Sequence, residues 1–215
     1  MQIKPTLLLS DLDGVYCNWA QGYVNYMESI GYKALHANPT VFSMTDIFPM
    51  LDKPWIHIKD YQQSEFYAGI LPYGGANEAY RELVKSGVKI IAVSSCGLEA
   101  ETVRMRTEFV AKQGVFSDMI LLELGAPKLD VLKKFAKAAF IDDQPVVALE
   151  GVEAGHVSML KCMPYNIDIT HPQIARVSQF AEIKTRMHTH PALSIACNID
   201  EPLDVEPSRK MRFAR

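Results

Sequence analysis

The sequence predicts a Rossmann-like α/β protein with a parallel sheet, helices on both faces of the sheet, and a small helical cap inserted after the first strand. Short apolar runs alternate with helix-length amphipathic stretches, which is typical of parallel strands joined by helices. The chain has 215 residues, of which 48% are hydrophobic and 22% charged, so it can bury a sizeable core. This length suits one domain with an insertion, or two small domains.

Five apolar runs are expected to form the strands, and the clearest is 88–93. The other four are 7–9, 119–122, 139–141 and 156–160. Helices are expected where apolar residues recur at helical spacing, namely at 76–86, 98–113 and 129–136 and after Gln144. Pro145 suits the first turn of the last helix, and Gly151 is expected to end it.

Residues 15–73 break the alternation and are expected to form the cap, with helices at 18–30 and near 59–68. Twelve of the twenty aromatic residues lie between Tyr16 and Tyr73. Most should form a core for the cap itself, and a minority could face a ligand. Residues 1–14 and 74–183 are then the core of the protein. Residues 184–215, which end in a basic run, are expected to be an extended or partner-docked tail.

Charge and cysteine spacing limit the possible partners. Lys and Arg number 22 against 25 Asp and Glu, giving a net charge of −3, which argues against strong binding to nucleic acid or to anionic membranes. No apolar run approaches the roughly 18 residues of a membrane span, and the leucines at 7–9 are too few for a signal-peptide core. Four scattered cysteines indicate neither a zinc site nor a disulfide framework. We therefore expect a cytoplasmic protein without a membrane partner.

Two pairs of acidic residues follow predicted strands. Asp11 and Asp13 come after the run 7–9, and Asp142 and Asp143 come after 139–141. The carboxyl ends of parallel strands meet at one edge of a sheet, where such folds bind ligands. Acidic side chains crowded there repel one another and need a cation or a shared proton. Each pair taken alone could also be a surface turn, because Asp and Gly favour turns.

Hydroxyls and a lysine lie at comparable places elsewhere. Ser94 and Ser95 follow the run 88–93, where they could hold an anion, although serine is also an ordinary helix cap. Lys128 precedes the helix expected at 129–136, where its charge opposes the helix dipole unless the ammonium reaches an anion. Each signal has an ordinary explanation, such as a solvated lysine. Four signals at the ends of four predicted strands favour one shared site.

As a set, these residues resemble the four motifs of the haloacid dehalogenase superfamily of phosphotransferases: Asp11-Leu-Asp13-Gly-Val15, Ser94, Lys128 and Asp142-Asp143. The resemblance spans about residues 7–150 and leaves room for the cap. Serine stands at the second motif where many relatives have threonine, which the family tolerates. The first motif with the aromatic cap, and the segment Met163-Pro-Tyr-Asn166, further resemble the 5′(3′)-deoxyribonucleotidase group.

The resemblance implies a role for each acidic residue. Asp11 is expected to be the nucleophile and Asp13 the general acid/base. Asp11, the main-chain carbonyl of Asp13 and the Asp142 side chain are expected to bind Mg²⁺, a hard cation that takes carboxylate oxygens and phosphate. Asp143 is expected to support the metal or the lysine from outside the ligand set.

The resemblance also implies which residues bind phosphate. Ser94 and Lys128 are expected to hold the phosphoryl oxygens, with Ser95 as the alternative hydroxyl. The implied activity is Mg²⁺-dependent hydrolysis of a phosphomonoester through an aspartyl-phosphate.

A nucleoside monophosphate is the favoured small substrate, and thus a 5′-nucleotidase activity, because aromatic rings of the cap can stack a base. The candidates for stacking are Trp19, Trp55, Phe66 and Tyr67. Alternative enzymes are a sugar-phosphate phosphatase or mutase, and a polynucleotide 3′-phosphatase. A further alternative is a catalytically retired fold kept as a binding module, which should have lost one of the motif residues that this chain retains.

Overall fold

The computed structural model describes residues 6–35 and 43–188. Six strands form one parallel sheet in the order β3-β2-β1-β4-β5-β6, which confirms the predicted Rossmann-like α/β fold. The strands are β1 (Leu7–Ser10), β2 (Lys89–Ser94), β3 (Asp118–Leu121), β4 (Ala139–Asp142), β5 (Val157–Lys161) and β6 (Ile174–Val177). Ser10, the last residue of β1, pairs with β2 on one side and with β4 on the other, so these strands end close together at one edge of the sheet.

Helices cover both faces of the sheet, as expected. The helices α5 (Ala76–Lys85), α6 (Ala100–Gln113) and α9 (Ile183–Arg186) contribute side chains to one buried cluster, and α7 (Leu129–Leu132) and α8 (Pro145–Glu153) lie on the other face. Successive residues of β1 point to opposite faces, so Leu8 packs in the first cluster and Leu9 in the second. Two short 3₁₀ helices, η2 (Pro164–Asn166) and η3 (Phe180–Glu182), follow β5 and β6.

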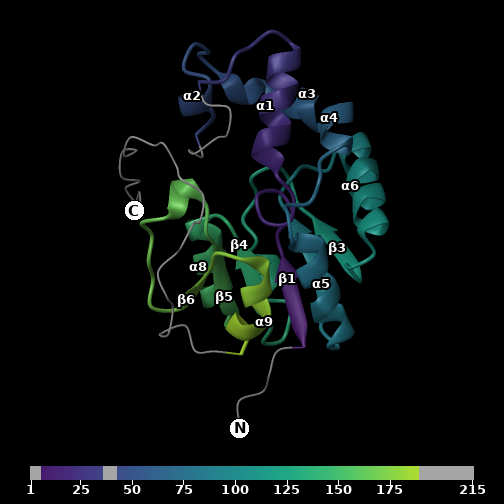
Figure 1. The fold of residues 1–215 in the computed structure, drawn as a ribbon, viewed down its shortest axis with the longest axis vertical. Coiled ribbons are helices and arrows are strands. Elements are labelled where there is room, and N and C mark those ends of the chain that lie inside the picture. Colours follow the sequence, from purple (N-terminus) through teal and green to yellow (C-terminus); the bar gives the residue numbers. More distant parts are fainter. Residues whose placement is uncertain (1–5, 36–42, 189–215) are drawn as a thin grey trace.

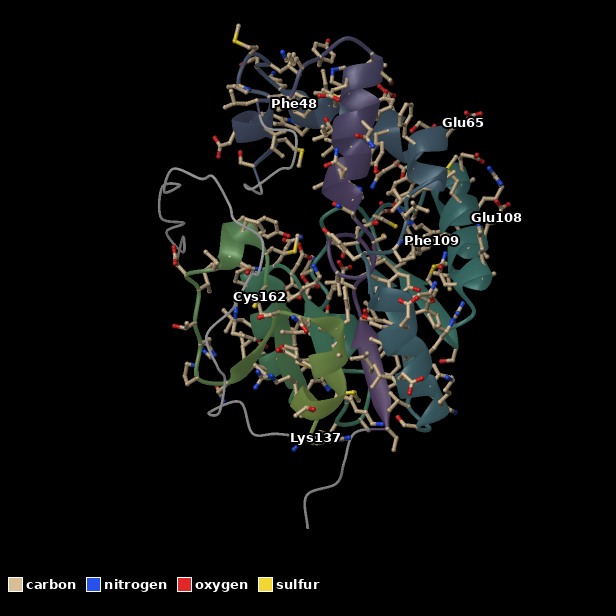
Figure 2. The ribbon with its side chains drawn as sticks, viewed as in Figure 1. Phe48, Glu65, Glu108, Phe109, Lys137 and Cys162 are labelled. Carbon is tan, nitrogen blue, oxygen red and sulfur yellow. The ribbon has the colours of Figure 1, made fainter. Side chains whose placement is uncertain are left out.

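The cap lies beyond the carboxyl ends of the strands (Figure 1). Its elements are α1 (Trp19–Ser29), α2 (Met44–Ile47), η1 (Pro54–His57), α3 (Ile58–Gln62) and α4 (Glu65–Ala68). Aromatic rings form its core: Tyr61 lies edge-on to Tyr23 at 5.3 Å between ring centroids, and Phe48 lies edge-on to Tyr23 at 6.0 Å. Phe48 is in the part of the cap farther from the sheet, whereas Phe109 lies on the core helix α6 (Figure 2).

The two chain segments that connect the cap to the core run side by side. Cys17 forms bridges with both Asp13 and Pro72. The N–H of Tyr73 donates to the carbonyl of Tyr16 at 2.9 Å. The incoming and outgoing segments are therefore hydrogen-bonded to each other directly after the first motif.

Several expected helix boundaries were wrong. The helix expected at 129–136 ends at Leu132. The helix near 59–68 is two helices, because the chain turns at Gln63 and Ser64 between α3 and α4. Gly151 does not end α8, which continues to Glu153. A Cβ at Gly151 would collide with the ring of Phe140, so this glycine allows α8 to approach the sheet.

Other features were missed or lie outside the expected boundaries. The strand β6 was not predicted, and α9 continues past residue 184, where the tail was expected to begin. The rest of that tail lies outside the described residues. Cys17 and Cys96 are free. Over residues 6–35 and 43–188, no helix combines the length and apolar character needed to cross a bilayer.

Candidate active site

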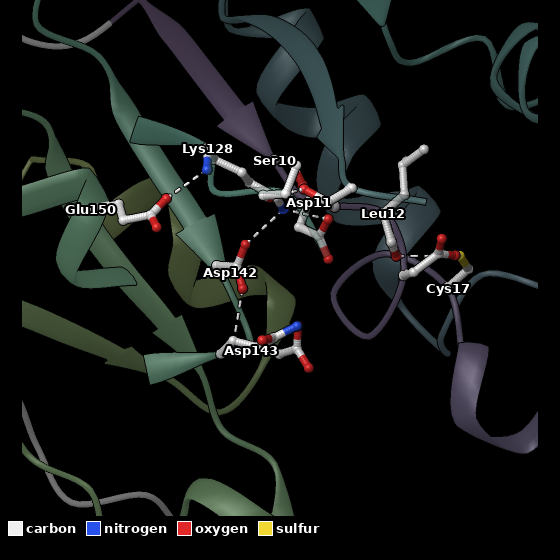
Figure 3. A network of polar contacts seen from close by, with 12 residues as sticks. Ser10, Asp11, Leu12, Cys17, Lys128, Asp142, Asp143 and Glu150 are labelled. Atoms are coloured by element: carbon white, nitrogen blue, oxygen red, sulfur yellow. Dashed lines mark hydrogen bonds and ion pairs between the residues drawn. The ribbon is translucent and has the colours of Figure 1, made fainter. Parts of the chain in front are cut away.

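A lysine joins two of the predicted acidic residues at the carboxyl ends of β1 and β4. The Nζ atom of Lys128 lies 2.6 Å from Oδ1 of Asp11 and 2.8 Å from Oδ2 of Asp142. All three side chains are buried. Figure 3 shows the Lys128 ammonium between the carboxylates of Asp11 and Asp142. The structure thus brings together residues that are 117 positions apart in the chain.

The surrounding main chain fixes this arrangement. The N–H of Asp11 donates to the carbonyl of Ile141 at 3.0 Å, which ties the end of β1 to β4. The N–H of Lys128 donates to Oε2 of Glu150 on α8 at 2.6 Å (Figure 3). Glu150 was not predicted as a site residue, because a glutamate on a helix is ordinarily solvated.

Charge and burial oppose each other in this cluster. Burial raises the pKa of Asp11 well above its usual range, and Lys128 only partly offsets this effect. Burial lowers the pKa of Lys128, but the adjacent carboxylates outweigh it, so that the pKa is raised and the ammonium stays charged. Buried carboxylates in such a group require positive charge. Lys128 supplies one positive charge for several acids.

Asp143 completes a group of three acidic side chains. One carboxylate oxygen each from Asp11, Asp142 and Asp143 lie within 4.8 Å of one another. The Tyr165 hydroxyl donates to Oδ2 of Asp143, and the Asn166 side chain donates to its main-chain carbonyl at 2.7 Å. Burial, and then the charge of Asp142, raise the pKa of the Asp143 carboxyl to about 7.

The oxygen atoms of this group fit a divalent cation. Asp142 uses Oδ2 for Lys128 and Oδ1 for the N–H of Gln144 at 2.9 Å. By contrast, Oδ1 of Asp143 is buried and has no hydrogen-bond partner. A buried acceptor without a partner is costly, and a bound cation would satisfy it. The three aspartates can therefore hold a metal ion such as Mg²⁺, which prefers carboxylate oxygens.

Asp13 lies apart from this group and has its own set of partners. Its Oδ1 is 3.0 Å from Nη2 of Arg106 and accepts a hydrogen bond from the Cys17 thiol at 3.3 Å. Its Oδ2 accepts a hydrogen bond from the Tyr67 hydroxyl at 3.1 Å. Neither Arg106 nor Cys17 was predicted as a site residue. An arginine within an amphipathic helix ordinarily indicates a solvated face, so no sequence signal marked Arg106.

The two serines have different surroundings. Ser94 is the last residue of β2 and is 1% exposed. Ser95 is half-buried, and its hydroxyl donates to the carbonyl of Ala126 at 2.7 Å. The hydroxyl of Ser95 therefore joins two loops at this edge of the sheet, which leaves Ser94 as the better candidate for binding an anion.

The four aromatic residues predicted to face a ligand are in unlike surroundings. Tyr67 is 1% exposed and contacts Asp13, so the expectation that it stacks on a substrate is not supported. Trp19 is half-buried and stacks on Tyr23 at 5.2 Å between centroids. Trp55 and Phe66 are 50% and 41% exposed, and Phe66 lines a cavity of about 620 Å³ between α1 and α4.

A larger cavity of about 740 Å³ lies between α5 and the segment after β6. Lys161 lines it, with Nζ 3.9 Å from the ring centroid of Tyr73. Burial lowers the pKa of Lys161 to about 8 despite the nearby Asp143. Lys161 was not predicted, because a lysine at the end of an apolar run usually reaches solvent.

No protein-family model and no curated protein matches the sequence. Solved structures do match the fold. Protein tyrosine kinase A from Mycobacterium tuberculosis is 17% identical with a TM-score of 0.64, and the match covers 87% of this chain and 100% of that one. CbbY from Rhodobacter sphaeroides, solved in complex with phosphate, is 14% identical with a TM-score of 0.54, over 83% and 96%. A Had-superfamily hydrolase from Ehrlichia chaffeensis is 15% identical with a TM-score of 0.51, over 87% and 98%.

These similarities show a fold of the haloacid dehalogenase type. This agrees with the strand order and with the placement of the acidic residues at the carboxyl ends of β1 and β4. At this level of identity the matches concern the fold alone. The reaction has to be argued from the side chains of this chain.

Proposed function

We propose that this protein is a Mg²⁺-dependent phosphomonoester hydrolase of the haloacid dehalogenase superfamily. The observation that carries the proposal is the Lys128 ammonium held between the carboxylates of Asp11 and Asp142, with Asp143 beside them. A lysine and a cation at the same group of acids suit a dianionic phosphoryl group. The resemblance of the sequence motifs points to the same chemistry.

In this proposal Asp11 is the nucleophile. Its carboxylate oxygen attacks phosphorus as the ester bond breaks, which gives an aspartyl-phosphate, and water later cleaves that acyl phosphate. Lys128 and Ser94 hold the phosphoryl oxygens. Asp13 gives a proton to the leaving oxygen and takes one from the attacking water.

The metal would be held by the acidic group. The sequence motifs favour Asp11, the Asp13 main-chain carbonyl and Asp142 as ligands. The hydrogen bonds of Asp142 and the unpaired Oδ1 of Asp143 support Asp143 as a direct ligand as well. When bound, Mg²⁺ would neutralise the repulsion between these acids and an anionic substrate.

The finer proposal is a 5′-nucleotidase activity on a nucleoside monophosphate. The exposed ring of Phe66 in the cavity between α1 and α4 supports it, because such a ring can stack a base. A sugar-phosphate phosphatase or mutase keeps the same chemistry with a different leaving group. We also propose a cytoplasmic location. The proposed division of the chain is a catalytic core at residues 1–14 and 74–183, a cap at 15–73 and a tail at 184–215.

A substrate panel with and without Mg²⁺ tests the proposal. The panel holds para-nitrophenyl phosphate, 5′- and 3′-nucleoside monophosphates, sugar phosphates and a 3′-phosphorylated oligonucleotide. We expect phosphate release that requires Mg²⁺ and disappears in Asp11→Asn, whereas Asp168→Asn, a change at an exposed aspartate, leaves it intact. A folded protein that is inert on the whole panel would refute the proposal. ATP-dependent labelling of tyrosine would favour a kinase instead.

A further inference from the structure

The carboxylate of Asp13 is held by residues from three separate parts of the chain. Tyr67 lies on the cap helix α4, Arg106 lies on the core helix α6, and Cys17 lies in the segment that leads into the cap. Cys17 donates a hydrogen bond to Oδ1 at 3.3 Å, Tyr67 donates one to Oδ2 at 3.1 Å, and Arg106 forms an ion pair with Oδ1 at 3.0 Å. A side chain with partners on both oxygens cannot rotate without losing at least one of these contacts.

Arg106 and Tyr67 also contact each other. The guanidinium carbon of Arg106 lies 3.6 Å from the ring centroid of Tyr67, well within the range of a cation–π contact. The helices α4 and α6 that carry them are in contact. This pair therefore connects the cap to the core at the side chain of Asp13.

A purely structural role explains Arg106 poorly. Its side chain is 1% exposed, and its Nε and Nη2 atoms are buried without a hydrogen-bond partner. Among the residues that the structure describes, Asp13 is the acidic residue that forms an ion pair with Arg106. Burying an incompletely satisfied arginine costs stability, and an apolar side chain would fill the same space more favourably. The retention of a guanidinium here indicates that it serves Asp13.

We propose that Tyr67 and Arg106 are positioning residues that orient the Asp13 carboxyl group for proton transfer and make this orientation depend on the place of the cap. The inference rests on the proposed phosphatase activity. In the first step the proton of Asp13 goes to the ester oxygen as its bond to phosphorus breaks. In the second step water gives a proton to Asp13 as its oxygen bonds to phosphorus and the bond from Asp11 to phosphorus breaks. Each donor uses one lone pair of a carboxyl oxygen, and the remaining lone pairs can carry the proton.

The leaving group provides a specific test. An alkyl ester, such as a nucleoside monophosphate or a sugar phosphate, needs a proton on its leaving oxygen, whereas para-nitrophenolate leaves without one. Tyr67→Phe removes one oxygen atom and keeps the ring beneath Arg106. We expect it to slow the first step, release of the alcohol in a single turnover, about 10- to 100-fold for the best alkyl substrate, and to slow release of para-nitrophenolate far less. KM should change little, because the proposal concerns proton transfer and not substrate binding.

The controls separate positioning from packing. Tyr61→Phe removes the hydroxyl of another buried cap tyrosine. That hydroxyl donates to the carbonyl of Trp19. The change should lower the rate on both substrates equally or leave both rates unchanged. Arg106→Lys should retain part of the activity that Arg106→Met loses. Arg104→Gln, on the exposed side of the same helix, should behave as wild type. Circular dichroism and thermal unfolding confirm that each variant folds.

The outcomes distinguish this inference from the proposed function. A wild-type protein that hydrolyses no substrate refutes the phosphatase proposal itself. If the wild-type protein is active but Tyr67→Phe slows the first step equally for both classes of ester, or changes only KM, the positioning role is refuted. Higher activity in Tyr67→Phe would also refute it, because the contact would then be holding Asp13 away from the substrate.

Discussion

Gly14 lies directly against the carboxylate of Asp143. A Cβ on Gly14 would come within 2.5 Å of Oδ2 and 2.9 Å of Oδ1 of Asp143, and the φ angle of Gly14 is +98°. The backbone conformation and the close approach both require glycine at this position. The first motif can therefore pack against Asp143 of the fourth motif only because Gly14 has no side chain.

Gly14→Ala should both destabilise the protein and displace Asp143. We expect a loss of about 2–4 kcal/mol in the free energy of unfolding, from the left-handed backbone and from the collision, together with weaker Mg²⁺ binding. Chemical denaturation and calorimetry with Mg²⁺ measure the two effects. Gly31→Ala is the matched control, because Gly31 has φ +94° and no atom lies within 4 Å of the place that a Cβ would take there. If both variants lose the same stability and bind Mg²⁺ equally, the close approach is unimportant.

Lys128→Met should abolish most activity. The change keeps the length of the side chain and removes the charge that lies 2.6 Å from Asp11 and 2.8 Å from Asp142. We expect kcat to fall about 10²- to 10³-fold, as for other groups that stabilise charge in a transition state. Without metal, the variant should also lose about 3–5 kcal/mol of stability, because the acids lose their buried partner.

Lys133→Met is the control for Lys128, since Lys133 forms an exposed ion pair with Glu153 at 2.9 Å. Its stability should change by less than about 1 kcal/mol. Steady-state kinetics and urea denaturation measure both variants. Wild-type turnover in Lys128→Met would exclude a role for this lysine in phosphate binding.

Asn166→Leu should lower the stability of the protein, because it removes the hydrogen bonds that hold the main chain at Asp143. The side-chain amide of Asn166 donates to the carbonyls of Asp143 at 2.7 Å and Lys161 at 2.9 Å, and its oxygen accepts from Met163 N–H at 2.9 Å. Leaving these buried groups unpaired should cost about 3 kcal/mol or more. Asn25→Leu removes only an exposed contact with Gln21 and should cost less than about 0.5 kcal/mol. Equal midpoints of thermal unfolding for the two variants would contradict this assignment.

His156 should make stability depend on pH. Its Nδ1 accepts the N–H of Ala138 at 3.2 Å while Nε2 lies 3.0 Å from the carbonyl of Leu132, an arrangement that the neutral ring satisfies. Burial lowers the pKa of His156 below 6.5. The unfolded chain therefore takes up a proton first as the pH falls, and the free energy of unfolding should decrease from about pH 7 toward pH 5.

The variant His156→Asn keeps an acceptor but does not titrate, so its stability should vary less with pH over that range. His188→Asn, at an exposed histidine, should keep the wild-type slope. Urea denaturation at several pH values measures both slopes. A His156→Asn slope equal to that of wild type would assign the pH dependence to other groups.

Much of the sheet could be predicted because its central strands are simple apolar runs that end in polar residues. The run 88–93 became β2 with a shift of one residue, and the acids after β1 and β4 lie where the parallel arrangement requires. The strand β6 was missed because Arg176 interrupts its short apolar run. Only the folded chain shows that the Arg176 guanidinium reaches the carbonyl of Ile169 and Oδ1 of Asn166.

The candidate site was less predictable where it depends on packing between distant elements. The motifs identify Asp11, Lys128 and Asp142, because each follows a strand or begins a helix. Nothing in the local sequence distinguishes the buried Arg106 from the exposed Arg104, two positions earlier on the same helix. The difference arises when α4 packs on α6.

The hydrogen bonds between the two segments that join the cap to the core have a consequence for how such proteins diversify. Because the N–H of Tyr73 already bonds to Tyr16, the intervening chain leaves and returns at a single place. A short turn could replace it without moving the sheet, and a different insert could be grafted there. An exchanged insert would also have to replace the Tyr67 hydroxyl at Asp13, so the insert and the edge of the sheet that carries Asp13 have to change together.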